Sequence, residues 1–300
     1  MLDTIIYGDS ISEIKTFPDC FVHAIISDIP YGISYNEWDV LHSNTNTALG
    51  GSSAAQEEAG SVFKRRGKPL NGWSRADKSI PLEYQQWCGS WASGWLRVLK
   101  PGGSCFIFAG RRYAHRCISA LEDSGFTFKD MLAWEKSMAP HRAQRVSEIY
   151  KRRGNDEAEV KWAGWRVANL RPLFEPILWF QKPYRTGATL ADNILEYGVG
   201  AWNEDALTRY TAGNSIEPPH SNIIRIASDK SDRGLHETQK PLKLMEFLIA
   251  LVTTEDAIVL DPFAGSGTTC LAARNLGRHY IGIEADEGYA QIASDRLSRP

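Results

Sequence analysis

Val259-Leu-Asp-Pro-Phe-Ala-Gly-Ser-Gly-Thr-Thr269 runs from an apolar strand through a glycine-rich turn directly into a helix. Gly265 and Gly267 would let the backbone pass close to a ligand, because a Cβ at either position would collide with it. Glu284 ends the following strand, about 20 residues further along, where an acid can accept hydrogen bonds from ribose hydroxyls. The spacing is not Gly-x-Gly-x-x-Gly and no Lys follows, so a nucleoside without a pyrophosphate is favoured. The alternative is a plain tight turn followed by a solvated Glu.

Short apolar stretches alternate with stretches of helical periodicity along the rest of the chain. This alternation is typical of an α/β fold, in which a mostly parallel sheet carries helices on both faces. The expected strands are 4–7, 22–27, 104–108, 126–134, 174–180, 221–227, 257–260 and 280–283. The expected helices are 87–99, 113–123, 241–253, 267–276 and 287–297.

Two segments do not follow this alternation. Residues 39–80 are rich in Ser, Asn, Gly and Ala, and we expect them to form a long mobile insertion. In a compact domain such an insertion usually means a functional loop or disorder. Residues 183–232 mix aromatic, Gly, Pro and polar residues with little periodicity apart from the expected strand.

The composition is that of an ordinary globular protein: 300 residues, 43% hydrophobic, 23% charged, with a net charge of -2. This balance excludes a protein held to nucleic acid by bulk positive charge. The charge is uneven, however, because residues 59–153 are strongly basic and lie between acidic flanks, as a DNA cleft would require. The five Cys are scattered, so we expect neither disulfides nor a structural metal site. No apolar run approaches a membrane span and no signal peptide is recognisable, so a cytoplasmic location without membrane contact is expected.

A second expected strand leads into the polar turn Asp28-Ile-Pro-Tyr31. Ligands of open α/β sheets bind outside the carboxyl ends of the strands, so this turn and the glycine-rich turn are expected to line one crevice. Asp28 offers a carboxylate, Pro30 a carbonyl and Tyr31 an aromatic face. These groups suit a planar ring with an NH₂ substituent, because two acceptors take its two N–H bonds while the ring stacks on Tyr31. Taken alone, the tetrapeptide could equally be an ordinary turn.

Four motifs together resemble the DNA amino-methyltransferases, in the circularly permuted β-type order that places the catalytic turn before the S-adenosylmethionine loop. These motifs are Asp28-Ile-Pro-Tyr31, Lys100-Pro-Gly-Gly103, His236-Glu-Thr-Gln-Lys-Pro241 and Asp261-Pro-Phe-Ala-Gly-Ser-Gly-Thr-Thr269. The resemblance implies one permuted domain (1–300) with a Rossmann-like methyltransferase sheet of seven strands, one of them antiparallel. It divides the chain into a catalytic half (1–182), a target-recognition segment (183–232) and a cofactor-binding half (233–300). Ile29 departs from the family, which usually has Pro at this position.

The resemblance also implies the chemistry of the catalytic turn. Asp28 and the carbonyl of Pro30 would hold the target amine in a pyramidal form, and Tyr31 would stack on a base flipped out of double-stranded DNA. The methyl group would pass in line from S-adenosylmethionine, so alignment and desolvation would carry most of the catalysis and no metal would be needed. Methylation of cytosine C5 would need a Cys nucleophile in a Pro-Cys dipeptide, which this chain lacks.

The cofactor-binding residues that the resemblance implies come from five parts of the chain. They are Asp9, Asp28, His236, Lys240, Asp261, Phe263, Ala264, Gly265, Ser266, Gly267, Thr268, Thr269 and Glu284. Glu284 would bind the ribose and Asp9 would lie near the adenine. His236 and Lys240 would border the methionine end, where a Lys suits a carboxylate. The alternative for this last pair is the capping region of a helix with an exposed Lys.

Asp rather than Ser at the first position of the catalytic turn favours adenine N6 over cytosine N4 as the target. A cytosine-N4 enzyme, an RNA or protein N-methyltransferase and a non-catalytic DNA-binding module, which Ile29 makes conceivable, stay open as alternatives. A homodimer stays open as well.

Aromatic and basic clusters add two further expectations. Trp87, Trp91 and Trp95 are spaced four residues apart, which predicts a buried stripe on one helix face rather than a base-stacking platform. Lys64-Arg65-Arg66, Arg111-Arg112 and Lys151-Arg152-Arg153 are candidates for phosphate contacts, although such runs are more often solvated surface.

Overall fold

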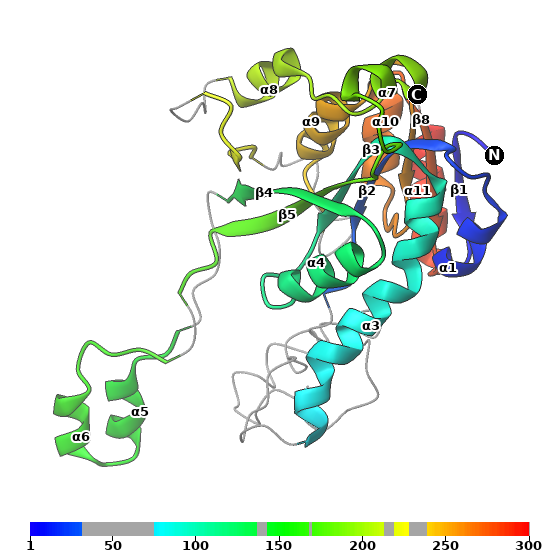
Figure 1. The fold of residues 1–300 in the computed structure, drawn as a ribbon. Helices are drawn as coiled ribbons and strands as arrows, with labels where there is room; N and C mark the ends of the chain where they lie inside the picture. The colour runs from blue at the N-terminus through cyan, green and yellow to red at the C-terminus, as the bar shows by residue number, and fades with distance from the viewer. Residues whose placement is uncertain (32–74, 137–142, 168–169, 213–218, 228–238, 300) are drawn as a thin grey trace.

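The computed structural model describes residues 1–31, 75–136, 143–167, 170–212, 219–227 and 239–299. This part of the chain forms one sheet of eight strands in the order β1-β8-β7-β2-β3-β5-β4-β6, with helices on both faces (Figure 1). The strands are β1 Thr4–Tyr7, β2 Val22–Asp28, β3 Leu99–Phe108, β4 Thr127–Glu135, β5 Phe174–Gln181, β6 Ile223–Ile224, β7 Ile258–Asp261 and β8 His279–Glu284. The α/β fold expected from the alternation is confirmed.

Strand β5 is the antiparallel strand of this sheet, running opposite to both β3 and β4, while the other neighbouring strands pair in parallel. The count of seven strands is wrong by one, because Ile223 and Ile224 pair with the end of β4 and form an eighth strand. This β6 is much shorter than the strand expected over 221–227.

The described helices are α1 Ser10–Glu13, the 3₁₀ helix η1 Ile14–Thr16, α3 Arg75–Val98, α4 Ala114–Asp123, α5 Val146–Arg152, α6 Asp156–Lys161, α7 Leu190–Tyr197, α8 Glu204–Thr211, α9 Leu242–Val252, α10 Thr268–Asn275 and α11 Glu287–Ser298. Two buried apolar clusters hold the layers together. Side chains of α3 and α4 pack on one face of the sheet, and those of α9 and α10 pack on the other. Burial of this apolar surface is the main driving force for the layered fold.

Helix α3 begins at Arg75, well before the expected start of that helix, so the expected insertion 39–80 is wrong over its last residues. The rest of that insertion lies outside the described residues. Pro81 lies inside the helix and removes one backbone hydrogen bond. Ile80 and Tyr84 on either side of it are both buried in the core, and this packing outweighs the local break.

The segment 183–232 is more regular than its sequence indicates, since it contains α7, α8 and β6. Thr189 and Asp192 form a capping box at the start of α7, and the Asn203 side chain caps α8. Both helices are short, so too few turns repeat for a clear periodicity. The short helices α5 and α6, also unexpected, form an arm that leaves the sheet between β4 and β5 (Figure 1).

The register of the central strands brings distant residues to one edge. Asp28 at the end of β2 pairs with Phe108 at the end of β3, and Phe108 pairs with Ile177 in β5. Because β5 runs the other way, its first residues lie at the carboxyl edge of β2 and β3. No helix of the described ranges is long and apolar enough to cross a membrane.

Candidate active site

The Asp28-Ile-Pro-Tyr31 turn and the glycine-rich turn line one cavity of about 550 Å³ at the carboxyl edge of the parallel strands. The residues of the expected cofactor set that line this cavity are Asp9, Asp28, Lys240, Asp261, Phe263, Ala264, Gly265, Ser266, Thr268, Thr269 and Glu284. Gly267 is absent from that lining, and His236 lies outside the described residues. The fold therefore brings together two turns that are far apart in the sequence.

The two glycines of the glycine-rich turn are needed for different structural reasons. Gly265 has a φ of 52° and lines the cavity, as a backbone that passes close to a ligand would. Gly267 has a φ of 76° and precedes α10, and a Cβ there would lie 2.9 Å from the Cβ of Ala293 in α11. This glycine therefore lets α10 pack closely on α11, and the expectation that it also makes room for a ligand stays a prediction.

Glu284 ends β8 and links that strand to the glycine-rich turn. Its Oε2 accepts a hydrogen bond from the Gly265 amide at 2.7 Å, and its Oε1 accepts one from the Asp286 amide at 2.9 Å. Burial raises the pKa of this carboxyl above its usual value, although these amides oppose the shift. Each carboxylate oxygen retains a further lone pair, so Glu284 can still accept hydrogen bonds from a ligand.

Asp261 ends β7 and supports the floor of the cavity. It is 3% exposed, and its Oδ1 accepts hydrogen bonds from the Ser27 hydroxyl at 2.7 Å and from the Phe263 amide at 3.1 Å. Burial raises the pKa of this carboxyl to about 6, against the effect of its hydrogen bonds. Asp261 thus ties β7 to the neighbouring strand β2 as well as lining the cavity.

The two carboxylate oxygens of Asp28 differ in their hydrogen bonding. Its Oδ2 accepts a hydrogen bond from the Lys240 ammonium at 2.5 Å, whereas its Oδ1 is buried without a hydrogen-bond partner in the described part of the chain. Burial raises the pKa of this carboxyl, and the Lys240 charge opposes that shift. The Pro30 carbonyl accepts a hydrogen bond from the Tyr84 hydroxyl at 3.3 Å. Ile29 is 1% exposed, so the residue that departs from the family packs into the core.

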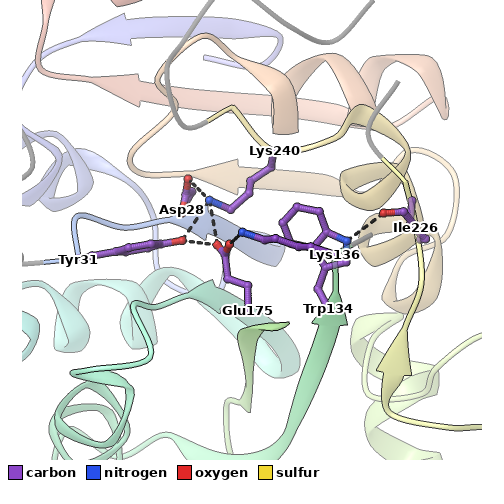
Figure 2. A network of polar contacts seen from close by, with 7 residues as sticks. All are labelled: Asp28, Tyr31, Trp134, Lys136, Glu175, Ile226 and Lys240. Carbon is purple, nitrogen blue, oxygen red and sulfur yellow. Dashed lines mark hydrogen bonds and ion pairs between the residues drawn. The ribbon is translucent and has the colours of Figure 1, made fainter. Parts of the chain in front are cut away.

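Figure 2 shows a partly buried ion network that consists of Asp28, Tyr31, Lys136, Glu175 and Lys240. Lys240 Nζ lies 3.1 Å from Glu175 Oε1 and donates to the Tyr31 hydroxyl oxygen at 3.1 Å. Tyr31 donates its hydroxyl to Glu175 Oε1, and Lys136 pairs with Glu175 Oε2. Burial alone would raise the pKa of Glu175, but Lys240 and Lys136 lower it to about 2. The Lys240 pKa is raised, because Asp28 and Glu175 outweigh the opposing effect of burial.

Four residues at this site were not predicted from the sequence. Glu175 and Lys136 belong to the ion network, and the one signal for Glu175 is a charged residue in an otherwise apolar strand. Trp91 and Trp95 are buried as predicted, but Trp87 of the same stripe lines the cavity beside Phe263. Gln239 also lines the cavity, and both polar atoms of its side chain are buried without a partner among the residues that the structure describes.

The geometry supports one kind of chemistry. Asp28 and Pro30 line the same cavity as a glycine-rich turn with an acid able to bind hydroxyl groups, and the buried Oδ1 of Asp28 has no partner among the described residues. The described residues contain no group of three or more His, Cys, Asp or Glu that could hold a metal ion. The site thus has acceptors for an amine beside a pocket of a size suited to a nucleoside.

Comparison with known proteins identifies relatives over nearly the whole chain. A family model described as DNA methylase matches residues 22–295. The chain is 61% identical over 297 residues to Type II methyltransferase M.HindIII of Haemophilus influenzae, covering 99% of this chain and 96% of that protein. The M1.HpyAVI–SAM complex has a similar fold, with a TM-score of 0.53 and 23% identity over 98% of this chain and 99% of that one. PvuII DNA methyltransferase, described as cytosine-N4-specific, has a TM-score of 0.59 and 17% identity over 98% of this chain and 86% of that one.

Proposed function

The chain belongs to the N6_N4_Mtase family of DNA methylases, and from this premise we propose that it is a site-specific DNA methyltransferase. In this proposal it transfers a methyl group from S-adenosylmethionine to the N6 amine of an adenine flipped out of double-stranded DNA. The observation that carries the proposal is that Asp28 lines the cavity together with the glycine-rich turn and that its buried Oδ1 is an acceptor without a partner among the described residues.

The residues around the cavity fit S-adenosylmethionine. Glu284 keeps free lone pairs for ribose hydroxyls while the Gly265 amide fixes its orientation. Phe263 and Trp87, with ring centroids 5.8 Å apart, give the cavity an aromatic wall, and Asp9 lines it as well. When bound, the cofactor supplies a sulfonium methyl group that is already activated for attack.

The catalytic turn would bind and orient the amine. An amine conjugated to a ring is a poor nucleophile, because its lone pair is delocalised. Hydrogen bonds from its two N–H groups to Asp28 Oδ1 and the Pro30 carbonyl favour the pyramidal form, in which the lone pair points at the methyl carbon. As the N–C bond forms, the S–C bond breaks and S-adenosylhomocysteine leaves. The extra proton on the nitrogen can pass to Asp28, whose raised pKa suits a proton acceptor, or to water.

The choice of adenine rests on Asp28 itself. Asp rather than Ser at the first position of the turn favours adenine N6. Cytosine N4 presents a similar conjugated amine, so it is the competing target at the same site. The proposal of a specific DNA site is supported by the similarity to M.HindIII, a Type II methyltransferase.

Two measurements test this function. Plasmid DNA from cells that express the protein is digested to nucleosides and examined by mass spectrometry, and N6-methyladenine is expected. N4-methylcytosine without N6-methyladenine would contradict the choice of base.

Purified protein is then given labelled cofactor with duplex DNA, RNA and protein as competing acceptors. Label is expected in the duplex, and label confined to RNA or protein would contradict the DNA assignment.

A further inference from the structure

Glu175 is a buried carboxylate that the methyl-transfer chemistry above does not use. It is 8% exposed and lies near the start of β5. Because β5 is antiparallel, residues before Ile177 extend past the row formed by Asp28 and Phe108. The reversed strand thus delivers an acidic side chain to the edge of the sheet that carries the catalytic turn.

Both oxygens of Glu175 are engaged by side chains of the protein itself (Figure 2). Oε1 accepts the Tyr31 hydroxyl and lies 3.1 Å from Lys240 Nζ, and Oε2 pairs with Lys136. The Lys136 ammonium also lies 4.8 Å from the ring centroid of Trp134. Glu175 does not belong to the cavity lining in the described part of the chain, so this carboxylate acts on its neighbours rather than on a ligand.

Glu175 acts on the proposed amine-binding residue, Asp28, through Lys240. Its side chain is 6% exposed, and its ammonium lies between the two carboxylates, 2.5 Å from Asp28 Oδ2 and 3.1 Å from Glu175 Oε1. Asp28 Oδ1 is left without a partner in the described residues. If Glu175 carried no charge, Lys240 would have Asp28 as its remaining carboxylate and would compete with an amine for it.

We propose that Glu175 is a positioning residue for methyl transfer. It shares Lys240 with Asp28 and fixes the Tyr31 hydroxyl, so that Asp28 Oδ1 stays free for the target amine and the Tyr31 ring stays aligned for the base. The inference rests on the proposed function, because it concerns how the same site is held in order.

The test compares Glu175→Gln with Glu135→Gln as a matched control. Glu135 lies at the end of the adjacent strand β4 and pairs with Arg225 at 3.0 Å in a partly exposed ion pair outside the network. The full-length protein is mixed with labelled S-adenosylmethionine and duplex DNA under single-turnover conditions between pH 5 and pH 9. Cofactor affinity is measured by calorimetry and the melting temperature by calorimetric scanning.

We expect the single-turnover rate of Glu175→Gln to fall about 10-fold, with cofactor affinity within twofold of the wild type. The acid limb of its pH–rate profile should also move to lower pH. Four groups that can carry a charge interact with the Asp28 carboxyl. Lys240 comes from the segment before α9 and Glu175 from β5. Asp261 comes from β7, and Tyr31 belongs to the same turn as Asp28. Of these charges, that of Glu175 raises the Asp28 pKa, so its removal lets Asp28 ionise at lower pH.

A second variant tests the hydrogen bond between the Tyr31 hydroxyl and Glu175. Tyr31→Phe keeps the ring but removes the hydroxyl that Glu175 holds, so we expect a smaller loss of rate, about threefold, with cofactor affinity retained. Glu135→Gln should match the wild type in rate and pH profile.

Two results would overturn the inference. One is a Glu175→Gln enzyme that matches the wild type in rate and acid limb. The other is a loss of rate that accompanies a lower melting temperature and weaker cofactor binding while the acid limb stays in place, because this indicates a purely structural role. A wild-type protein that transfers no label to duplex DNA would instead contradict the proposed function itself.

Discussion

At the scale of single residues, burial controls the carboxyl groups that support the cavity. Asp261 is enclosed at the end of β7, and burial raises its pKa to about 6 although Ser27 and the Phe263 amide donate to it. The ionised form is therefore less stable in the folded chain than in the unfolded one. Glu175 differs from Asp261, because the ammonium groups of Lys240 and Lys136 lower the pKa of Glu175 to about 2 although it is buried.

The Asp261→Asn variant tests this difference through the pH dependence of stability. Between about pH 4 and pH 6 the unfolded chain releases the Asp261 proton while the folded chain keeps it, so stability falls as the pH rises. The shift predicts that Asp261 lowers the free energy of unfolding by about 3 kcal/mol over this window, and the Asn variant should lack that component. Urea unfolding of both proteins at several pH values measures it. A stability difference that stays constant from pH 4.5 to pH 7.5 would contradict the assignment.

The place of Asp28, Pro30 and Tyr31 at the cavity could be predicted from the sequence, but their partners could not. Asp28, Pro30 and Tyr31 are neighbours in a turn whose chemistry can be worked out from three side chains. Glu175 and Lys136 reach the same place through strand order and strand direction. Neither the position nor the direction of β5 in the sheet follows from the local pattern of its residues.

At the scale of elements, helices were predictable where an apolar stripe repeats over several turns. The expected bounds of α4, α9, α10 and α11 agree with the structure to within one or two residues at each end. Helix α3 begins before the expected start at Trp87 and continues through Pro81, a residue that usually interrupts a helix. Helices α5 to α8 were missed because each spans at most eight residues and no motif marks its start, whereas the glycine-rich turn marks the start of the equally short α10. Their caps, such as Asn203, are single-residue signals that loops share.

The junction of α10 and α11 gives a prediction at this scale. Gly267 and Gly277 have similar φ values, 76° and 68°, but a Cβ would meet Ala293 at 2.9 Å only at Gly267 and nothing within 4 Å at Gly277. Gly277→Ala should therefore cost about 1 kcal/mol from backbone strain alone. Gly267→Ala should cost about 3 kcal/mol, because strain and overpacking add. Denaturant unfolding compares the two, and equal losses would show that helix packing does not explain Gly267.

At the scale of the whole molecule, the α5–α6 arm extends away from the sheet (Figure 1). It connects the end of β4 to the start of β5, so it leaves from the edge of the sheet that carries the Asp28–Tyr31 turn. Lys151 and Arg152 end α5 and Arg153 follows it, and all three are exposed. The near-neutral net charge of the chain therefore coexists with a local basic run, Lys151 to Arg153, in this arm.

Salt dependence tests whether this element contacts DNA. Replacing Arg152 and Arg153 with Ala should reduce the slope of log affinity against log salt by about 2, because each neutralised phosphate releases counterions. Cofactor affinity should not change. Lys15→Ala, on the exposed surface of η1, is the control and should leave the slope within error of the wild type. Fluorescence anisotropy of a labelled duplex provides the measurement, and an unchanged slope in the double variant would exclude the arm from phosphate contact.

The central claim is that Asp28 holds the amine that receives the methyl group, and the most direct measurement is methyl transfer by Asp28→Ala. Single-turnover transfer from labelled S-adenosylmethionine to duplex DNA is measured beside cofactor affinity in the same preparation. We predict that transfer falls at least about 1000-fold, because the amine loses both orientation and activation. The cofactor dissociation constant should change by less than about threefold, since Glu284 and the glycine-rich turn remain in place. An Asp28→Ala protein that binds the cofactor normally and methylates DNA at the wild-type rate would contradict the account.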